Sequence, residues 1–528
     1  MTQLNYRIEL HNGESYLGAC RAEEGETHIT LPLHGTLRAV TATMRLDCAA
    51  GEKIFMNGFQ SWTWCPEYRY DDRIRSLRAL PKKGVEHFGV DRYGDYYFVD
   101  YPDRKGVTHG ESYCYFRKGE KFRLIASLDE TPGYTLFCYD ALRAELTLRR
   151  DCEGLAVDGD FHAFDLFFAE GGEDEVFDAW FAAMAVGCRT KEKIAGYSSW
   201  YNRYENISAR TIYEDLCGCA SLLQPGDVFQ IDDGWEENVG DWLAADREKF
   251  PGGLKPIADE IHARGLRAGL WLAPFAANRA SRLYRHHPDW FFRHNGERWH
   301  CGMNWGGFYA LDFDHPEVRA YLKDVFSRVL DEWGFDLVKL DFLYAAAPFG
   351  SACETRAGRM RRAMAFLREL CGDRLILGCG VPLMPAFGLV DYCRIGCDVG
   401  LDWRNNWLMR HTNREVVSTT HSLSNTVFRR QLNGRAFLSD PDVFFLREDN
   451  LRLTEEEKLT LATANALFGG VFFCSDNMGR YDARTRALYR RLLETREAQN
   501  IRVAADTPGL VSVTYELDGI HKLLKIKF

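Results

Sequence analysis

The stretch LVKLDFLYAA, residues 337–346, places a lysine and an aspartate inside an otherwise apolar run. The run is too short for a helix and is typical of a buried strand. Because side chains alternate along a strand, Lys339 and Asp341 point to the same side. A buried charge is costly unless it is paired or has a function. We therefore expect this strand to end either in a buried ion pair or in a polar cavity that other charged groups share.

Seven further apolar runs resemble this strand, and amphipathic helical segments separate them. With residues 336–344, the expected strands cover 194–200, 227–235, 266–275, 374–382, 391–398, 434–443 and 469–477. Eight strand-then-helix units over roughly 300 residues match the count and length of a central (β/α)8 TIM barrel. An open, doubly wound sheet is the alternative, but eight units fit a closed barrel better.

The sequence on either side of this barrel has a different pattern. Residues 1–175 consist mainly of short alternating runs broken by turn residues, which predicts an N-terminal antiparallel β-sandwich. Residues 176–502 hold the expected barrel, and residues 503–528 indicate a small C-terminal antiparallel β segment. That segment is too small for a core of its own and should pack onto the barrel. The 528-residue chain is thus predicted to be a multidomain α/β and β protein.

Composition argues against several classes of function. The net charge of −10 disfavours a general affinity for nucleic acid or for an anionic membrane. The sequence begins without a visible secretory signal, and its longest apolar run is interrupted by polar residues. The 16 cysteines are scattered, many of them inside apolar runs where buried free thiols are expected. We therefore expect a cytoplasmic protein that binds neither nucleic acid nor membrane.

Charged and aromatic residues gather at the carboxyl ends of the expected strands, where barrel enzymes carry their active sites. In chain order they are Trp200, Asp232, Asp233, Trp235, Trp271, Lys339, Asp341, Cys379, Gly380, Arg394, Asp398, Asp440, Asp442 and Asp476. Any single aspartate among them could simply cap the helix that follows. Their recurrence at one rim, with Lys339 and Arg394 among the carboxylates, instead indicates a catalytic cavity.

Carboxylates accompanied by basic groups and tryptophans favour glycoside hydrolysis. One carboxylate attacks the sugar or activates water, and another protonates the departing oxygen, while tryptophan rings stack on the sugar. A Mg²⁺-dependent barrel enzyme is the competing class, because carboxylate rings bind Mg²⁺. No histidine joins the strand-end set, however, and Lys339 and Arg394 would repel a cation. We therefore expect neither a metal nor a cofactor.

Several motifs are similar to those of one known family. They are NGFQSWTW (57–64), FQIDDGW (229–235), GLWLAPF (269–275), VKLDFLYAA (338–346), LGCGVPLMPAFGLVDYCRIGCD (377–398) and FLSDPDVFFLRE (437–448). Together they resemble the α-galactosidases of glycoside hydrolase family 36, the melibiase type, and most of all its compact bacterial members. The resemblance covers the barrel nearly end to end and extends into the first domain.

The resemblance implies a retaining exo-glycosidase that removes terminal, non-reducing α-linked D-galactose from small oligosaccharides through a covalent glycosyl-aspartate. Asp341 would be the nucleophile and Asp398 the general acid/base, with their carboxyl groups about 5–5.5 Å apart. The implied substrate-binding residues are Asp232, Asp233, Lys339, Arg394, Trp200, Trp271, Trp62, Cys379 and Gly380. Lys339 should hold the pKa of Asp341 down, whereas Asp398 has to keep its proton through burial or through the nearby Asp341 charge.

Alternatives remain open at this point. The family also includes α-N-acetylgalactosaminidases, and Cys379 is too small to decide which sugar is preferred. A non-catalytic carbohydrate-binding protein would usually lack one of the two carboxylates, and both are present. Preference beyond the first sugar could depend on VGLDWRNNWLMRHTN, residues 399–413.

Some of the singled-out residues also have purely structural interpretations. Trp62 and Trp64 would otherwise be assigned to the sandwich core, and Asp440 and Asp442 to a loop shaped by the proline between them. Asp476 could be a helix cap, and Trp235 and Trp242 could line the cavity entrance.

Overall fold

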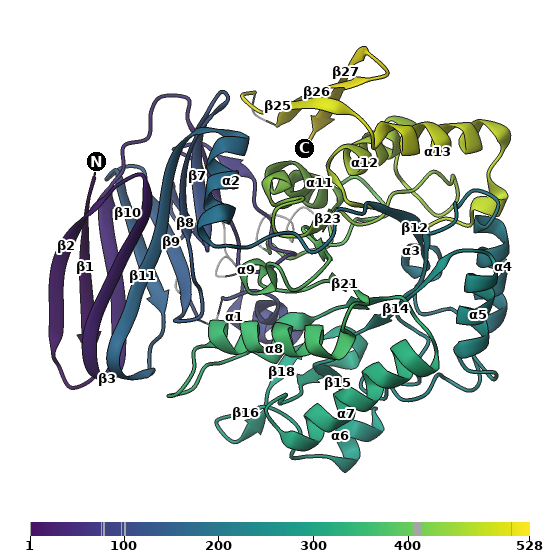
Figure 1. Cartoon of the computed structure of the whole chain (residues 1–528), viewed down its shortest axis with the longest axis horizontal. Coiled ribbons are helices and arrows are strands. Elements are labelled where there is room, and N and C mark those ends of the chain that lie inside the picture. The colour runs from purple at the N-terminus through teal and green to yellow at the C-terminus, as the bar shows by residue number, and fades with distance from the viewer. Residues whose placement is uncertain are drawn as a thin grey trace.

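The computed structural model describes residues 2–528 apart from 75–76, 78–79, 97, 100–101, 405–412 and 508. Antiparallel sheets from the N-terminal part of the chain lie beside a parallel barrel, and a small C-terminal sheet lies across one end of the barrel helices (Figure 1). The predicted fold class is confirmed: a central (β/α)8 barrel, an N-terminal antiparallel sandwich and a small C-terminal β segment. None of the described helices is both long enough and apolar enough to cross a membrane.

Two long strands, β3 (Gly25–Arg45) and β11 (Ala156–Gly172), connect the two sheets of the sandwich. They pair antiparallel along most of their lengths, and each then pairs with different neighbours toward its ends. The other strands are β1 (Thr2–Leu10), β2 (Ser15–Ala22), β4 (Lys53–Met56), β5 (Glu67–Tyr68), β6 (Val107–Glu111), β7 (Tyr113–Lys118), β8 (Lys121–Ser127), β9 (Tyr134–Asp140) and β10 (Glu145–Asp151). Alternate residues such as Leu146 and Leu148 are fully buried, which is the period-2 pattern visible in the sequence.

Eight parallel strands form the barrel, and each lies inside a range predicted from the sequence. They are β12 (Ile194–Ser198), β13 (Val228–Ile231), β14 (Arg267–Leu272), β20 (Leu337–Leu340), β21 (Leu375–Gly378), β22 (Tyr392–Arg394), β23 (Leu438–Asp440) and β24 (Val471–Cys474). The last strand pairs with the first. The Gly470 N–H also donates to the Ser439 carbonyl at 2.8 Å, which links β24 to β23. The sheet therefore curls into a nearly closed barrel rather than an open one.

Helices cover the outside of the barrel. They are α3 (Trp200–Arg203), α4 (Ala209–Cys219), α5 (Lys255–Ala263), α6 (Arg282–His286), α7 (Pro316–Ser327), α8 (Arg356–Cys371), α9 (Leu383–Ala386), α11 (Thr419–Phe428), α12 (Glu455–Phe468) and α13 (Ala483–Thr495). Ser208, Thr355, Thr454 and Asp482 accept backbone N–H groups as N-caps of α4, α8, α12 and α13. Every residue of α11 is buried, because this helix lies between the barrel and the sandwich (Figure 1).

The chain departs from regular barrel topology between β14 and α7. It forms the short strands β15 (Ala276–Asn278), β16 (Arg293–His294), β17 (Glu297–Arg298), β18 (His300–Gly302) and β19 (Phe308–Ala310). The sequence analysis did not predict this excursion, because its strands are only two or three residues long and show no alternation. Two helices precede the barrel strands, α1 (Lys82–Phe88) and α2 (Glu173–Ala183), and three strands follow the barrel, β25 (Gln499–Ala504), β26 (Leu510–Leu517) and β27 (Ile520–Lys527).

The loop after β4 brings the sandwich onto the strand ends of the barrel. The Ser61 N–H donates to the Val381 carbonyl at 2.9 Å, and the Cys65 N–H donates to Asn425 Oδ1 at 2.8 Å. Arg429, at the end of α11, is fully buried and donates to the Ser61 carbonyl at 2.7 Å. These bonds fix Trp62, which the loop carries, above the carboxyl ends of the strands.

Candidate active site

Asp341 follows β20 directly, at the carboxyl ends of the barrel strands, and its side chain is buried. Trp271 Nε1 donates to its Oδ2 at 3.1 Å, and the Phe342 N–H donates to its Oδ1 at 2.8 Å. Burial raises the pKa of Asp341, while the Lys339 charge and hydrogen bonds from Cys379 and Trp271 oppose the rise. Lys339 thus lowers this pKa, as expected, but burial outweighs its charge and the net shift is upward.

Lys339 forms the buried ion pair that its position in the strand suggested. Its Nζ donates to Asp232 Oδ2 at 2.9 Å, and Gln230 Nε2 donates to the same oxygen at 2.6 Å. Burial by itself would lower the pKa of Lys339, but the charges of Asp232 and Asp341 raise it above its usual range. Lys339 is thus a fixed cation between two aspartates, and the residue that neutralises it most closely is Asp232.

Asp233 belongs to a second buried acidic pair. Its Oδ2 accepts a hydrogen bond from Trp305 Nε1 at 2.8 Å, and its carboxyl group is hydrogen-bonded to that of Glu236. Burial raises the pKa of Asp233 to about 6 and raises that of Glu236 well above its usual range. Sequence reasoning missed both partners. Trp305 lies in the unpredicted excursion, and Glu236 comes just after the DDGW motif without any signal of its own.

Arg394, at the end of β22, is surrounded by carboxylates. It donates to Asp398 Oδ1 at 2.8 Å, to Asp442 Oδ1 at 2.7 Å and to Asp440 Oδ2 at 3.3 Å. Asp442 also accepts from the Tyr201 hydroxyl at 2.6 Å. Burial raises the pKa of Asp442 to about 6, although Arg394 opposes the rise. Asp440 and Asp442 therefore form ion pairs with Arg394. The sequence interpretation, in which they only shape a loop around the proline, did not include this role.

Asp398 differs from the other acids in its exposure. Its side chain is 38% exposed, whereas that of Asp442 is 1% exposed. The burial that we expected around Asp398 is therefore not found, although its neighbours Asp440 and Asp442 are buried.

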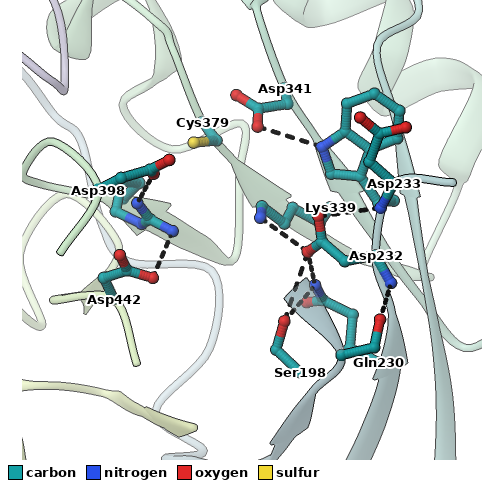
Figure 2. A network of polar contacts seen from close by, with 12 residues as sticks. Ser198, Gln230, Asp232, Asp233, Lys339, Asp341, Cys379, Asp398 and Asp442 are labelled. Carbon is teal, nitrogen blue, oxygen red and sulfur yellow. Dashed lines mark hydrogen bonds and ion pairs between the residues drawn. The ribbon is translucent and has the colours of Figure 1, made fainter. Parts of the chain in front are cut away.

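Cys379 and Gly380, after β21, lie beneath Trp62. Trp62 Nε1 donates to Cys379 Sγ at 3.3 Å, and its ring meets that of Phe342 edge-on at 5.1 Å. Gly380 has φ of 58°, and a Cβ atom there would lie 2.9 Å from the Trp62 ring. Burial raises the pKa of the Cys379 thiol well above its usual range. Figure 2 shows the Cys379 sulfur between Asp341 on one side and Asp398 with Asp442 on the other.

Comparison with known proteins finds similarity to melibiase-type α-galactosidases. The Melibiase family profile matches residues 218–370. The structure of the α-galactosidase TtGalA from Thermus thermophilus, in complex with p-nitrophenyl α-D-galactopyranoside, aligns with a TM-score of 0.74 and 27% identity. That alignment covers 95% of this chain and 99% of TtGalA. The chain is therefore similar to melibiase-type α-galactosidases, and in structure the similarity extends over nearly its whole length.

Curated relatives match over shorter segments. The bifunctional α-galactosidase/sucrose kinase AgaSK of Mediterraneibacter gnavus is 30% identical over 211 residues, which are 36% of this chain and 21% of AgaSK. The α-galactosidase Mel36A of Lactobacillus acidophilus is 33% identical over 122 residues, which are 22% of this chain and 16% of Mel36A. The chain therefore spans about a fifth of the length of the curated relatives that it matches.

The tryptophans singled out in the sequence differ in their surroundings. Trp271 is in contact with Asp341, and Trp200 opens α3 with its ring 5.2 Å from that of Tyr204. Trp235 and Trp242 are fully buried. The suggestion that these two line the entrance was wrong, because neither ring reaches solvent and they pack against Trp333 and Trp271.

Three further sequence interpretations have different outcomes in the structure. Asp476 caps no helix; it accepts from Arg447 Nη1 at 2.6 Å and from the Tyr481 hydroxyl at 2.7 Å. Trp64 is not sandwich core, since its ring stacks on that of His421 at 4.1 Å. The segment 399–413 was predicted to influence preference beyond the first sugar, and its residues 405–412 lie outside the described residues.

Proposed function

We propose that this chain is an exo-acting, retaining α-galactosidase that releases terminal, non-reducing α-linked D-galactose from small oligosaccharides. The observation that carries the proposal is the placement of Asp341 after β20 and of Asp398 after β22, at one rim of a barrel, in a chain whose likeness to TtGalA covers 95% of its residues. The TtGalA structures hold p-nitrophenyl α-D-galactopyranoside and stachyose. The 16 cysteines, all among the described residues, are free thiols, which favours a reducing cytoplasm and imported sugars as substrates.

In the proposed mechanism Asp341 attacks the anomeric carbon. Two hydrogen bonds, from Trp271 Nε1 and from the Phe342 N–H, hold its carboxylate in one orientation. Asp398 gives its proton to the departing oxygen, and the covalent galactosyl-aspartate forms. Asp398 then takes a proton from water, which attacks the same carbon from the opposite face and restores the original anomeric configuration.

The remaining side chains would bind the sugar and stabilise charge. Asp232 and Asp233 present carboxylate oxygens that can accept bonds from sugar hydroxyls, and each is oriented by a bond from Lys339 or Trp305. The positive charges of Lys339 and Arg394 would reduce the repulsion among the neighbouring carboxylates at neutral pH. Trp62 covers Cys379 and closes the cavity from the sandwich side.

The first experiment measures release of p-nitrophenol from its α-galactoside by the wild type and by Asp341→Asn. We expect the variant to lose at least about 1,000-fold in kcat, because the amide cannot form the glycosyl ester. NMR of the first product should show α-galactose. Appearance of the β-anomer first would contradict retention, and an active Asp341→Asn would contradict the assignment of the nucleophile.

An α-N-acetylgalactosaminidase is the second candidate. A galactosaminidase of Flavonifractor plautii, described as acting on A type blood α-D-galactosamine, is 36% identical over 141 residues, 25% of this chain and 13% of that protein. Galactoside and N-acetylgalactosaminide offered side by side separate the two activities. We expect the galactoside to be preferred, because Trp62 covers Cys379 and leaves that thiol 1% exposed.

A further inference from the structure

Within the part of the chain that the structure describes, a single side chain bonds to the carboxyl group of Asp398. Among the described residues its carboxylate bonds only to Arg394, from Nη1 to Oδ1 at 2.8 Å. With 38% of the side chain exposed, apolar packing does not hold it either. Its position therefore depends on where the Arg394 guanidinium lies and on the path of the backbone after β22.

Asp442 bonds both to the Arg394 guanidinium and to the backbone that follows Asp398. Its Oδ1 accepts from Arg394 Nη2 at 2.7 Å, so it holds the guanidinium from the side opposite Asp398. Its Oδ2 accepts from the N–H of Val399 at 2.8 Å, which is the peptide that immediately follows Asp398. The Tyr201 hydroxyl donates to the same Oδ2 at 2.6 Å. One carboxylate thus links the ion-pair partner of Asp398, its backbone and a tyrosine of the neighbouring helix α3.

The backbone at Asp442 is itself held in an uncommon conformation. Its φ is 75°, in the left-handed region that a residue with a Cβ atom seldom adopts. The Asp442 N–H donates to Asp440 Oδ1 at 2.9 Å, and Asn465 Nδ2 donates to the Asp442 carbonyl at 3.0 Å. Such a conformation persists where its surroundings fix it from several sides, and it is frequent at functional sites.

We propose that Asp442 is a positioning residue for Asp398: through Arg394 and the Val399 peptide it aims the acid/base carboxyl at the departing oxygen. Tyr201 belongs to the same assembly, because it holds the Asp442 oxygen that binds the Val399 N–H. The inference rests on the proposed function, in which Asp398 is the acid/base. It assigns to Asp442 no contact with the sugar.

The test compares two α-galactosides that differ in their need for an acid. Methyl galactoside has a poor leaving group, so its cleavage depends on protonation of the departing oxygen. The 2,4-dinitrophenolate of 2,4-dinitrophenyl galactoside departs without protonation. For Asp442→Asn we expect kcat/KM to fall about 100-fold on the methyl galactoside, within the usual range for general acid catalysis, and less than about 5-fold on the dinitrophenyl galactoside. Tyr201→Phe, a milder change, should fall about 10-fold on the methyl galactoside alone.

Asp476→Asn is the matched control. Asp476 is also buried after a barrel strand and is also bonded to an arginine and a tyrosine, but its partners are Arg447 and Tyr481. Any loss that it causes should be equal for the two substrates. Equal losses in folded Asp442→Asn and Tyr201→Phe would overturn the positioning role, even if the wild type is an α-galactosidase. A wild type inactive on both galactosides would overturn the proposed function and this inference with it.

Discussion

At the residue scale, Asp233 and Glu236 form a pair of buried carboxyl groups just after strand β13. Both are buried, and their side chains are hydrogen-bonded to each other, so at least one of them must carry a proton. Burial raises both pKa values, that of Asp233 to about 6. The folded state consequently binds more protons than the unfolded chain above about pH 4, and its stability falls as the pH rises toward the folded pKa values.

Glu236→Gln should remove part of this pH dependence. The amide can still donate to Asp233, but it does not titrate. Between pH 5 and pH 7 the wild type should lose about 1–2 kcal/mol of unfolding free energy more than the variant, as expected for one group with a raised pKa. Urea unfolding at both pH values measures the difference. Glu237→Gln, which removes the neighbouring exposed glutamate, should behave like the wild type, and parallel slopes for all three proteins would contradict the argument.

At the element scale, the sequence predicts regular structure well and irregular structure poorly. All eight barrel strands are recognisable because buried parallel strands are continuous apolar runs, and their carboxyl ends locate Asp341 and Arg394. The excursion that carries Trp305 left no periodic signal. The role of Asp442 depends on a left-handed backbone after Pro441, and that of Trp62 on a contact 317 residues away along the chain. Neither feature is encoded in a local pattern.

Gly380 tests how closely Trp62 is seated on β21. Gly380→Ala brings a methyl group to 2.9 Å from the Trp62 ring and 3.0 Å from the Phe342 nitrogen. Gly372→Ala is the matched control, since Gly372 has a similar φ of 53° but no atom within 4 Å of the added Cβ. We expect a loss of about 1 kcal/mol for the control, from backbone strain alone, and of about 2–4 kcal/mol for Gly380→Ala, from strain and overpacking together. If urea unfolding gives equal losses of unfolding free energy for the two variants, the Trp62 ring can move away from the added methyl group at little cost.

At the scale of the whole molecule, Arg429 connects the sandwich to the barrel. It is fully buried, and it donates to the carbonyls of Ser61 and Ile395 at 2.7 and 2.9 Å. A further bond runs from its Nε to Asn57 Oδ1 at 3.1 Å. Arg429 therefore joins the sandwich to the barrel through charge-assisted hydrogen bonds to a backbone carbonyl of each. The loop that it holds is the one that carries Trp62 over the cavity.

Arg429→Lys should therefore weaken the coupling between the sandwich and the barrel, so that the two unfold separately. The ammonium cannot reach all three acceptors, so we expect a loss of about 2–4 kcal/mol, on the scale of several unmet buried hydrogen bonds. Calorimetry should show one unfolding transition for the wild type and two for the variant, and galactosidase activity should fall as Trp62 loosens. Arg435→Lys is the control, because Arg435 bonds to Asp174 and Asp178 of α2 at the protein surface. A single, merely lowered transition with unchanged activity in Arg429→Lys would mean that apolar packing along α11, rather than this arginine, holds the sandwich in place.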